Sequence, residues 1–137
     1  MRFLILAFAL TATACAKEEP AATGLAAGTF TSGDRDALCI AGEAGAQRAG
    51  FVTYGADDAN CSASGRLEAA GTGWILIPAG DSNCRISLSV SGERIALGPA
   101  TPGCAYYCGP SVTFAGKSFE RALGAKSATD FAGDPLC

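Results

Sequence analysis

The chain has 137 residues and an acidic balance, with ten Lys and Arg residues against thirteen Asp and Glu residues and a net charge of −3. This length is that of one domain, and the scattered charges exclude the basic stripe by which a protein binds nucleic acid. The sequence contains no histidine, which excludes Ser-His-Asp and Cys-His catalysis and metal sites built on imidazole.

The first fifteen residues have the order of a secretory signal peptide. Arg2 supplies a positive charge, residues 3–10 form an unbroken apolar run, and small residues stand directly before Cys15. The ending Ala12-Thr13-Ala14-Cys15 resembles the lipobox of bacterial prolipoproteins, in which the cysteine becomes the lipidated first residue of the mature protein. Ala12 stands where that motif more often has Leu. The apolar run is shorter than the roughly 20 residues that a membrane-spanning helix needs.

This resemblance implies a signal peptide over residues 1–14 and a membrane anchor on Cys15. The mature chain then has nine basic residues against thirteen acidic ones. Ala16 gives no retention signal of the Asp type, so the outer membrane facing the periplasm is the expected location. Cleavage by the ordinary signal peptidase is the alternative, and it would give a secreted or soluble periplasmic protein.

After Cys15, the chain is predicted to continue as a tether and then as one domain. Residues 15–28 are rich in small and polar residues and have no hydrophobic period, which is typical of a flexible tether. Residues 29–137 form the expected single disulfide-rich β domain.

Alternation of apolar and polar residues predicts strands along this domain. It runs through residues 61–69 and 84–91, so each of these strands has one buried and one wet face. Residues 73–77 are apolar throughout and indicate a strand covered on both sides. The turn Ser91-Gly92-Glu93 predicts a hairpin with a strand over 94–97. Earlier strands are expected at residues 30–31, 38–41 and 50–54.

The expected fold is mainly β, a small antiparallel meander that forms a barrel or a sandwich stapled by disulfides. Residues 98–103, with two prolines, are predicted to be a loop. At most one short helix is expected, near residues 117–123, where Phe119, Ala122 and Leu123 would lie on one side.

The cysteine count supports both the anchor and an oxidising compartment. With Cys15 lipidated, an even number remains for three disulfides, formed by Cys39, Cys61, Cys84, Cys104, Cys108 and Cys137. Six cysteines allow 15 pairings. The preferred set is Cys39–Cys61, Cys84–Cys104 and Cys108–Cys137, because a terminal cysteine is well placed to fasten the tail to the domain.

No residue pattern in the chain predicts a catalytic or metal site. The pair Cys104 and Cys108 is expected in disulfides rather than on a metal, and residues 57–60 are expected in a turn rather than around calcium. Paired carboxylates for a hydrolase remain open among Asp34, Asp36, Glu43, Glu68 and Glu93. No cofactor is expected.

Tyr106 and Tyr107 are the candidate binding residues, because they lie between two bonded cysteines in the segment 98–110. Tyr54 and Trp74 are weighed as further ligand contacts, with packing in the core as the alternative.

We therefore expect a non-enzymatic envelope module with a binding or structural role, whose partner is an envelope protein, a glycan or a small molecule. A first alternative is inhibition of lysozyme, because lipid-anchored inhibitors of C-type lysozyme are also small exported β-barrels with a lipobox. Their Ser-Gly-x-x-Tyr loop is not present here, since Ser64-Gly65 is followed by Arg66-Leu67-Glu68. A second alternative is a carboxylate-based hydrolase.

Overall fold

A computed structural model describes residues 24–124 and 127–137 of the chain. The predicted signal peptide, Cys15 and most of the predicted tether lie outside the described residues. Within these residues, no helix has the length and apolar character needed to cross a membrane.

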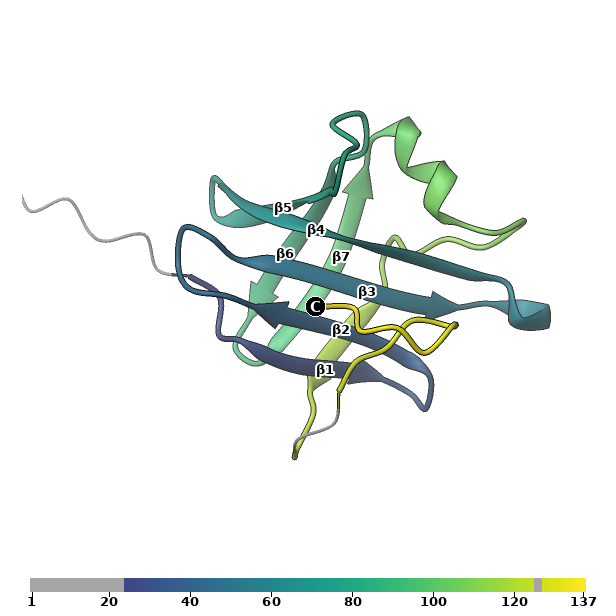
Figure 1. Cartoon of the computed structure of the whole chain (residues 1–137), viewed down its shortest axis with the longest axis horizontal. Coiled ribbons are helices and arrows are strands. Elements are labelled where there is room, and N and C mark those ends of the chain that lie inside the picture. Colours follow the sequence, from purple (N-terminus) through teal and green to yellow (C-terminus); the bar gives the residue numbers. More distant parts are fainter. Residues whose placement is uncertain (1–23, 125–126) are drawn as a thin grey trace, which may run out of the picture.

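The described chain forms a closed barrel of eight antiparallel strands in meander order (Figure 1). Each strand pairs with the next along the chain, and the last strand also pairs with the first. The predicted β meander is therefore confirmed, and of the two expected architectures the barrel is the one formed. The strands are β1 (Gly28–Ser32), β2 (Asp36–Ala41), β3 (Arg48–Tyr54), β4 (Asn60–Ala70), β5 (Gly73–Pro78), β6 (Ile86–Ser91), β7 (Arg94–Ala100) and β8 (Ser118–Arg121).

The alternation seen in the sequence sets the two faces of the barrel wall. On β4, Cys61, Ala63 and Leu67 are buried while Arg66 is exposed, as the period of two predicts. A Cβ on Gly65 would collide with the backbone carbonyl of Ile77, so glycine is required where β4 and β5 approach this closely.

One hydrophobic core fills the barrel, and a smaller cluster lies outside it. The barrel core includes Phe51 and Phe119, both fully buried. The outer cluster joins Cys39 and Val52 of the barrel wall to Ala128 and Leu136. Residues 127–137, here called the C-terminal segment, therefore cover the outer face of β2 and β3 (Figure 1).

Three disulfides fasten this structure, and two of the three preferred pairings are wrong. The bonds are Cys39–Cys137, Cys61–Cys108 and Cys84–Cys104, so only the last pairing is confirmed. Cys39 belongs to the outer cluster, whereas Cys61 belongs to the barrel core. The two sulfurs thus lie on opposite sides of the wall and cannot meet. Cys137 fastens the tail as expected, but to β2.

The one short helix that the sequence allows near 117–123 does not form, because the segment contains strand β8. Only Phe119 is buried there, and it points into the barrel core. The backbone of β8 pairs with β1 on one side and β7 on the other. Closure of the barrel satisfies hydrogen-bonding groups that two open strand edges would otherwise expose, and this outweighs the local preference for a helix.

The meander places alternate connections at opposite ends of the barrel. The end where the described chain begins is here called the tether end. There the buried Gln47 side chain accepts a hydrogen bond from the Leu25 N–H at 2.7 Å and donates one to the Leu25 carbonyl at 2.6 Å. The opposite end is called the distal end, and it carries the connections 33–35, 55–59, 79–85 and 101–117.

Candidate functional site

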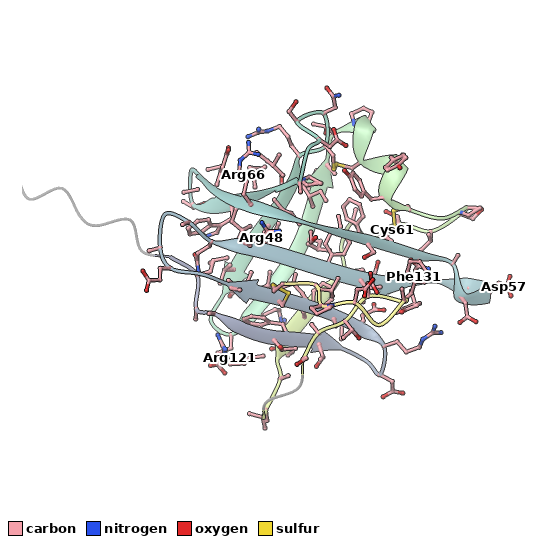
Figure 2. All side chains as sticks on the ribbon, viewed as in Figure 1. Arg48, Asp57, Cys61, Arg66, Arg121 and Phe131 are labelled. Carbon is pink, nitrogen blue, oxygen red and sulfur yellow. A yellow bond between two sulfur atoms is a disulfide. The ribbon has the colours of Figure 1, made fainter. Side chains whose placement is uncertain are left out.

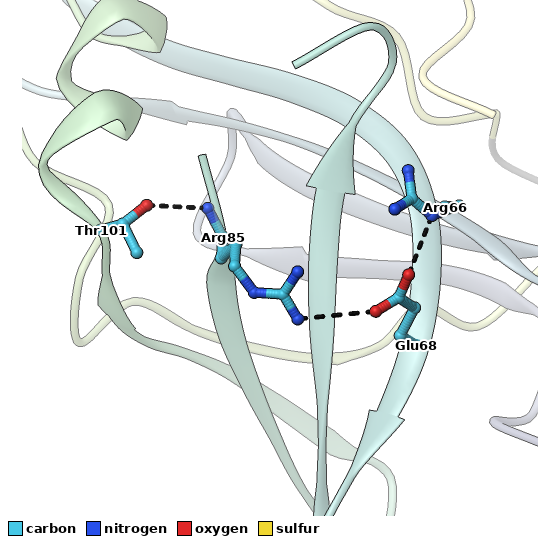
Figure 3. Close-up of polar contacts among 4 residues, drawn as sticks. All are labelled: Arg66, Glu68, Arg85 and Thr101. Carbon is cyan, nitrogen blue, oxygen red and sulfur yellow. Dashed lines mark hydrogen bonds and ion pairs between the residues drawn. The ribbon is translucent and has the colours of Figure 1, made fainter. Parts of the chain in front are cut away.

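The longest connection, residues 101–117, crosses the distal end and is here called the connector. The predicted loop over 98–103 is instead the end of β7 followed by the first turn of a 3₁₀ helix, η2 (Pro102–Tyr107). Pro102 stands in the first turn of η2, where the missing N–H costs nothing. The Thr101 hydroxyl accepts a hydrogen bond from the Arg85 N–H at 3.0 Å (Figure 3). It donates one to the Asn83 carbonyl at 2.6 Å, and the two bonds join the start of η2 to the connection 79–85.

Disulfides hold η2 on both sides of its tyrosines. Cys104 is bonded to Cys84 in the connection 79–85, and Cys108 is bonded to Cys61 on β4. The two cysteines therefore have separate partners, as predicted. Further along the connector, Phe114 packs on Phe51 of the barrel core with ring centroids 5.1 Å apart. The connector is thus fixed covalently at two points and by its own core residue at a third.

Tyr107 is a supporting residue rather than a contact residue. Its ring is half-buried against the barrel core, and its O–H donates to Asp81 Oδ2 at 3.0 Å. Asp81 Oδ1 in turn accepts the Asn83 N–H at 2.9 Å. Burial, followed by the hydrogen bond to Asp81, raises the pKa of Tyr107 above its ordinary value.

Tyr106 is the exposed member of the pair. Its side chain is 85% exposed, and its ring meets Tyr107 edge to face with centroids 5.3 Å apart. A large aromatic side chain in water, held by a rigid neighbour, offers contact area at a small entropic cost to a binding partner.

A cavity of about 340 Å³ lies beside η2, between the helix and the later part of the connector. Pro102, Ala105, Val112 and Phe114 contribute to its lining. The recess is shallow and mainly apolar, and Tyr106 does not line it but is exposed on the same 3₁₀ helix. An exposed aromatic residue and an apolar recess on one connector have the composition of a contact surface for another molecule. We call Tyr106 together with this recess the Tyr106 surface.

A second cavity, of about 210 Å³, lies between the β1–β2 hairpin and the C-terminal segment. Asp34, Asp36 and Asp130 line it. Asp36 is almost fully buried, accepts the Tyr54 N–H at 2.8 Å and pairs with Lys117 at 2.8 Å. Asp130 Oδ1 accepts two backbone N–H groups of its own turn. These two carboxylates therefore have structural partners.

The other carboxylates weighed for hydrolysis are spread over the molecule. Glu68 pairs with Arg66 and Arg85 on the barrel wall, and Glu93 pairs with Arg121 at 3.4 Å near the tether end. Within residues 24–124 and 127–137, no three His, Cys, Asp or Glu side chains gather as a metal site. The predicted turn at 57–60 overlaps the 3₁₀ turn η1 (Ala56–Asp58), and its last residue begins β4. Asp58 pairs with Arg35 at 2.6 Å.

The remaining candidate aromatic residues are half-buried, and Tyr54 also lines the cavity of about 210 Å³. Trp74 is half-buried against the barrel core, and Tyr54 is half-buried against the outer cluster with the Arg35 guanidinium 3.9 Å from its ring centroid. Ser64 and Gly65 lie inside β4, in the barrel wall rather than in a loop.

Sequence analysis missed the role of Asp81. The residues Asp81-Ser82-Asn83 indicate only a turn, and the contact with Tyr107 joins positions 26 residues apart. Comparison of the chain with known proteins finds no match among protein-family models, curated proteins or solved structures.

Proposed function

We propose that this protein is a lipid-anchored binding module of the bacterial cell envelope. It is held at the membrane through Cys15, preferably the outer membrane facing the periplasm, and it binds an envelope protein through the Tyr106 surface. The role is non-enzymatic and needs no cofactor. Lysozyme inhibition and carboxylate-based hydrolysis remain predictions from the sequence.

The observation that carries the binding role is the combination of exposure and rigidity at Tyr106. The ring is 85% exposed, while disulfides at Cys104 and Cys108 hold the turn on both sides of it. Exposed aromatic residues that are already ordered are the residues most often found at the centre of protein interfaces. The distal position supports the same role, because it lies at the opposite end of the barrel from the chain's entry at Leu25.

The compartment is supported by the disulfides. Six described cysteines form three bonds, and structural disulfides persist where the environment is oxidising, as in the bacterial periplasm.

A pull-down from envelope extract tests the binding role. The bait is the mature chain without its lipid, residues 16–137, compared with Tyr106→Ala. Phe131→Ala is the matched control, because Phe131 is a second exposed aromatic residue, 67% exposed on the C-terminal segment (Figure 2). We expect a partner that wild type and Phe131→Ala recover and Tyr106→Ala does not. Equal recovery by all three baits would contradict the proposal.

The anchor has its own test. Cys15→Ser is expected to abolish incorporation of labelled fatty acid and to release the protein from membrane fractions. Export of the wild-type chain without any incorporated fatty acid would contradict the anchor and leave the binding role to be judged by the pull-down.

A further inference from the structure

Three arginines gather on one outer face of the barrel, here called the arginine face. Arg48 on β3 lies directly opposite Arg66 on β4 in the strand register, and both are exposed (Figure 2). Arg85, next to β6, is connected to Arg66 by Glu68 (Figure 3). The Glu68 carboxylate accepts a hydrogen bond from Arg66 Nε at 3.0 Å and one from a terminal nitrogen of Arg85 at 3.5 Å. Arg66 and Arg85 thus share the Glu68 carboxylate, and Arg48 lies beside Arg66 in the strand register.

The excess of positive charge is confined to the arginine face. The other basic residues of the described chain each have a carboxylate of their own, in the pairs Arg35–Asp58, Arg94–Glu120, Lys117–Asp36 and Arg121–Glu93. The whole chain is acidic, with a net charge of −3. Like charges directly opposite on neighbouring strands are unfavourable, so folding alone does not account for Arg48 facing Arg66.

The arginine face begins at the root of the predicted tether. Arg48 directly follows Gln47, whose side chain makes two hydrogen bonds to the backbone of Leu25. Nine residues separate Cys15 from Leu25, and nine residues span at most about 30 Å. A lipid on Cys15 would therefore keep Arg48 close to the membrane surface.

We propose that Arg48, Arg66 and Arg85 dock the barrel on the anionic phospholipid headgroups of the membrane that holds the lipid on Cys15. This inference rests on the lipid anchor of the proposed function. Guanidinium groups bind phosphate oxygens in a bidentate way, which suits lipid headgroups. At an ionic strength of about 0.1 M, charges farther than roughly 10 Å are screened, so the membrane senses this face rather than the net charge of the protein.

The contact is weak by itself and becomes effective through the tether, because a short tether gives the second contact a high local concentration. It also fixes the orientation of the barrel. The arginine face runs from Arg48 near the tether end to Arg85 in the distal connection 79–85, and none of its three arginines belongs to the Tyr106 surface.

Partition onto vesicles tests the inference with residues 16–137, which carry no lipid. Vesicles of phosphatidylglycerol and phosphatidylcholine are compared with vesicles of phosphatidylcholine alone at about 0.1 M salt, where the protein senses the surface over roughly 10 Å. The test variant is Arg48→Gln with Arg66→Gln. The control is Arg35→Gln with Arg94→Gln, which removes the same charge from other exposed ion pairs.

We expect wild type and the control to partition onto the phosphatidylglycerol vesicles. We expect the test variant to lose about 30-fold in partition coefficient, from on the order of fivefold for each arginine near an anionic surface. Partition of wild type that is equal on both vesicle types, or an equal loss in both double variants, would overturn the inference. Because no variant depends on Cys15, this result is separate from that of the fatty-acid experiment.

Discussion

The connector and the C-terminal segment both cover the barrel, but they are attached in different ways. The connector is bonded at Cys104 and Cys108 and places Phe114 in the barrel core. The C-terminal segment is bonded only at its last residue and packs on a small cluster outside the barrel. The connector therefore completes the barrel core at the distal end and holds Tyr106 rigidly. The C-terminal segment instead packs on the outer face of β2 and β3.

The largest expected change in unfolding free energy follows removal of a disulfide, and it distinguishes the connector from the C-terminal segment. Replacing both Cys39 and Cys137 by Ala opens a loop of 98 residues, and replacing Cys61 and Cys108 opens one of 47. Loop entropy predicts losses in the free energy of unfolding of about 4.7 and about 4 kcal/mol, measured by urea unfolding. Only the second change removes a covalent attachment of the connector, so only it should lower recovery of the partner by the folded domain. Loss of recovery in the first variant alone would reverse the comparison.

A smaller effect is expected where the C-terminal segment touches the wall. A Cβ on Gly50 would collide with the backbone carbonyl of Leu136, so Gly50→Ala should push the segment outward and cost about 1–3 kcal/mol of unfolding free energy. Gly98→Ala is the control, since its Cβ would lie 3.4 Å from Ser87 in ordinary contact. Thermal unfolding measures both. An equal loss in the two variants would show that the close approach at Gly50 is not needed.

Tyr107, which supports Tyr106, is expected to make the stability of the fold depend on pH in the alkaline range. Burial raises the pKa of Tyr107 above 10.0, so folding favours the neutral phenol. The resulting stabilisation is complete below pH 10 and is lost as the pH rises through the raised value. At neutral pH, Tyr107→Phe should lower the free energy of unfolding by about 1 kcal/mol, because the hydrogen bond to Asp81 is lost. Above pH 10, the stability of this variant should fall less with rising pH than the stability of wild type. Urea unfolding at several pH values gives both quantities, and parallel pH profiles for the two proteins would contradict this role.

The smallest effect is expected on the arginine face. Arg48→Gln removes the like-charge pair with Arg66, so unfolding free energy should rise by a few tenths of a kcal/mol. Arg35→Gln, which loses its ion pair with Asp58, should show no rise. A fall in stability for Arg48→Gln at low salt would show that the two arginines do not repel each other in the folded protein.

The sequence predicts most of the wall of this barrel but not its closure. Alternation in β4 and the hairpin at Ser91-Gly92-Glu93 appear in the structure as expected. In β6 the alternation holds for Ile86 and Leu88, which are buried, but Val90 is 40% exposed. Strand β8 was missed because it is four residues long with only Phe119 buried, and its strand character comes from pairing with β1 and β7. Local pattern contains no information about partners so distant in the sequence.

The disulfides and the candidate site also depend on contacts between residues far apart in the sequence, which the local pattern does not reveal. Alternation indicates that a strand has two faces, but it does not say which face of β2 points outward, so the pairing of Cys39 could not be predicted. Tyr106 and Tyr107 were singled out together, and the structure separates them into an exposed and a supporting residue. That separation depends on Asp81, which is 26 residues away from Tyr107.

The most direct test of the central claim is photo-crosslinking in living cells. A photoreactive amino acid replaces Tyr106 in one variant and Phe131 in another, both in the chain of residues 1–137. The account predicts a specific protein adduct after illumination with the label at position 106 and none at position 131. An adduct at position 131 without one at position 106 would contradict the claim that the Tyr106 surface is the binding site.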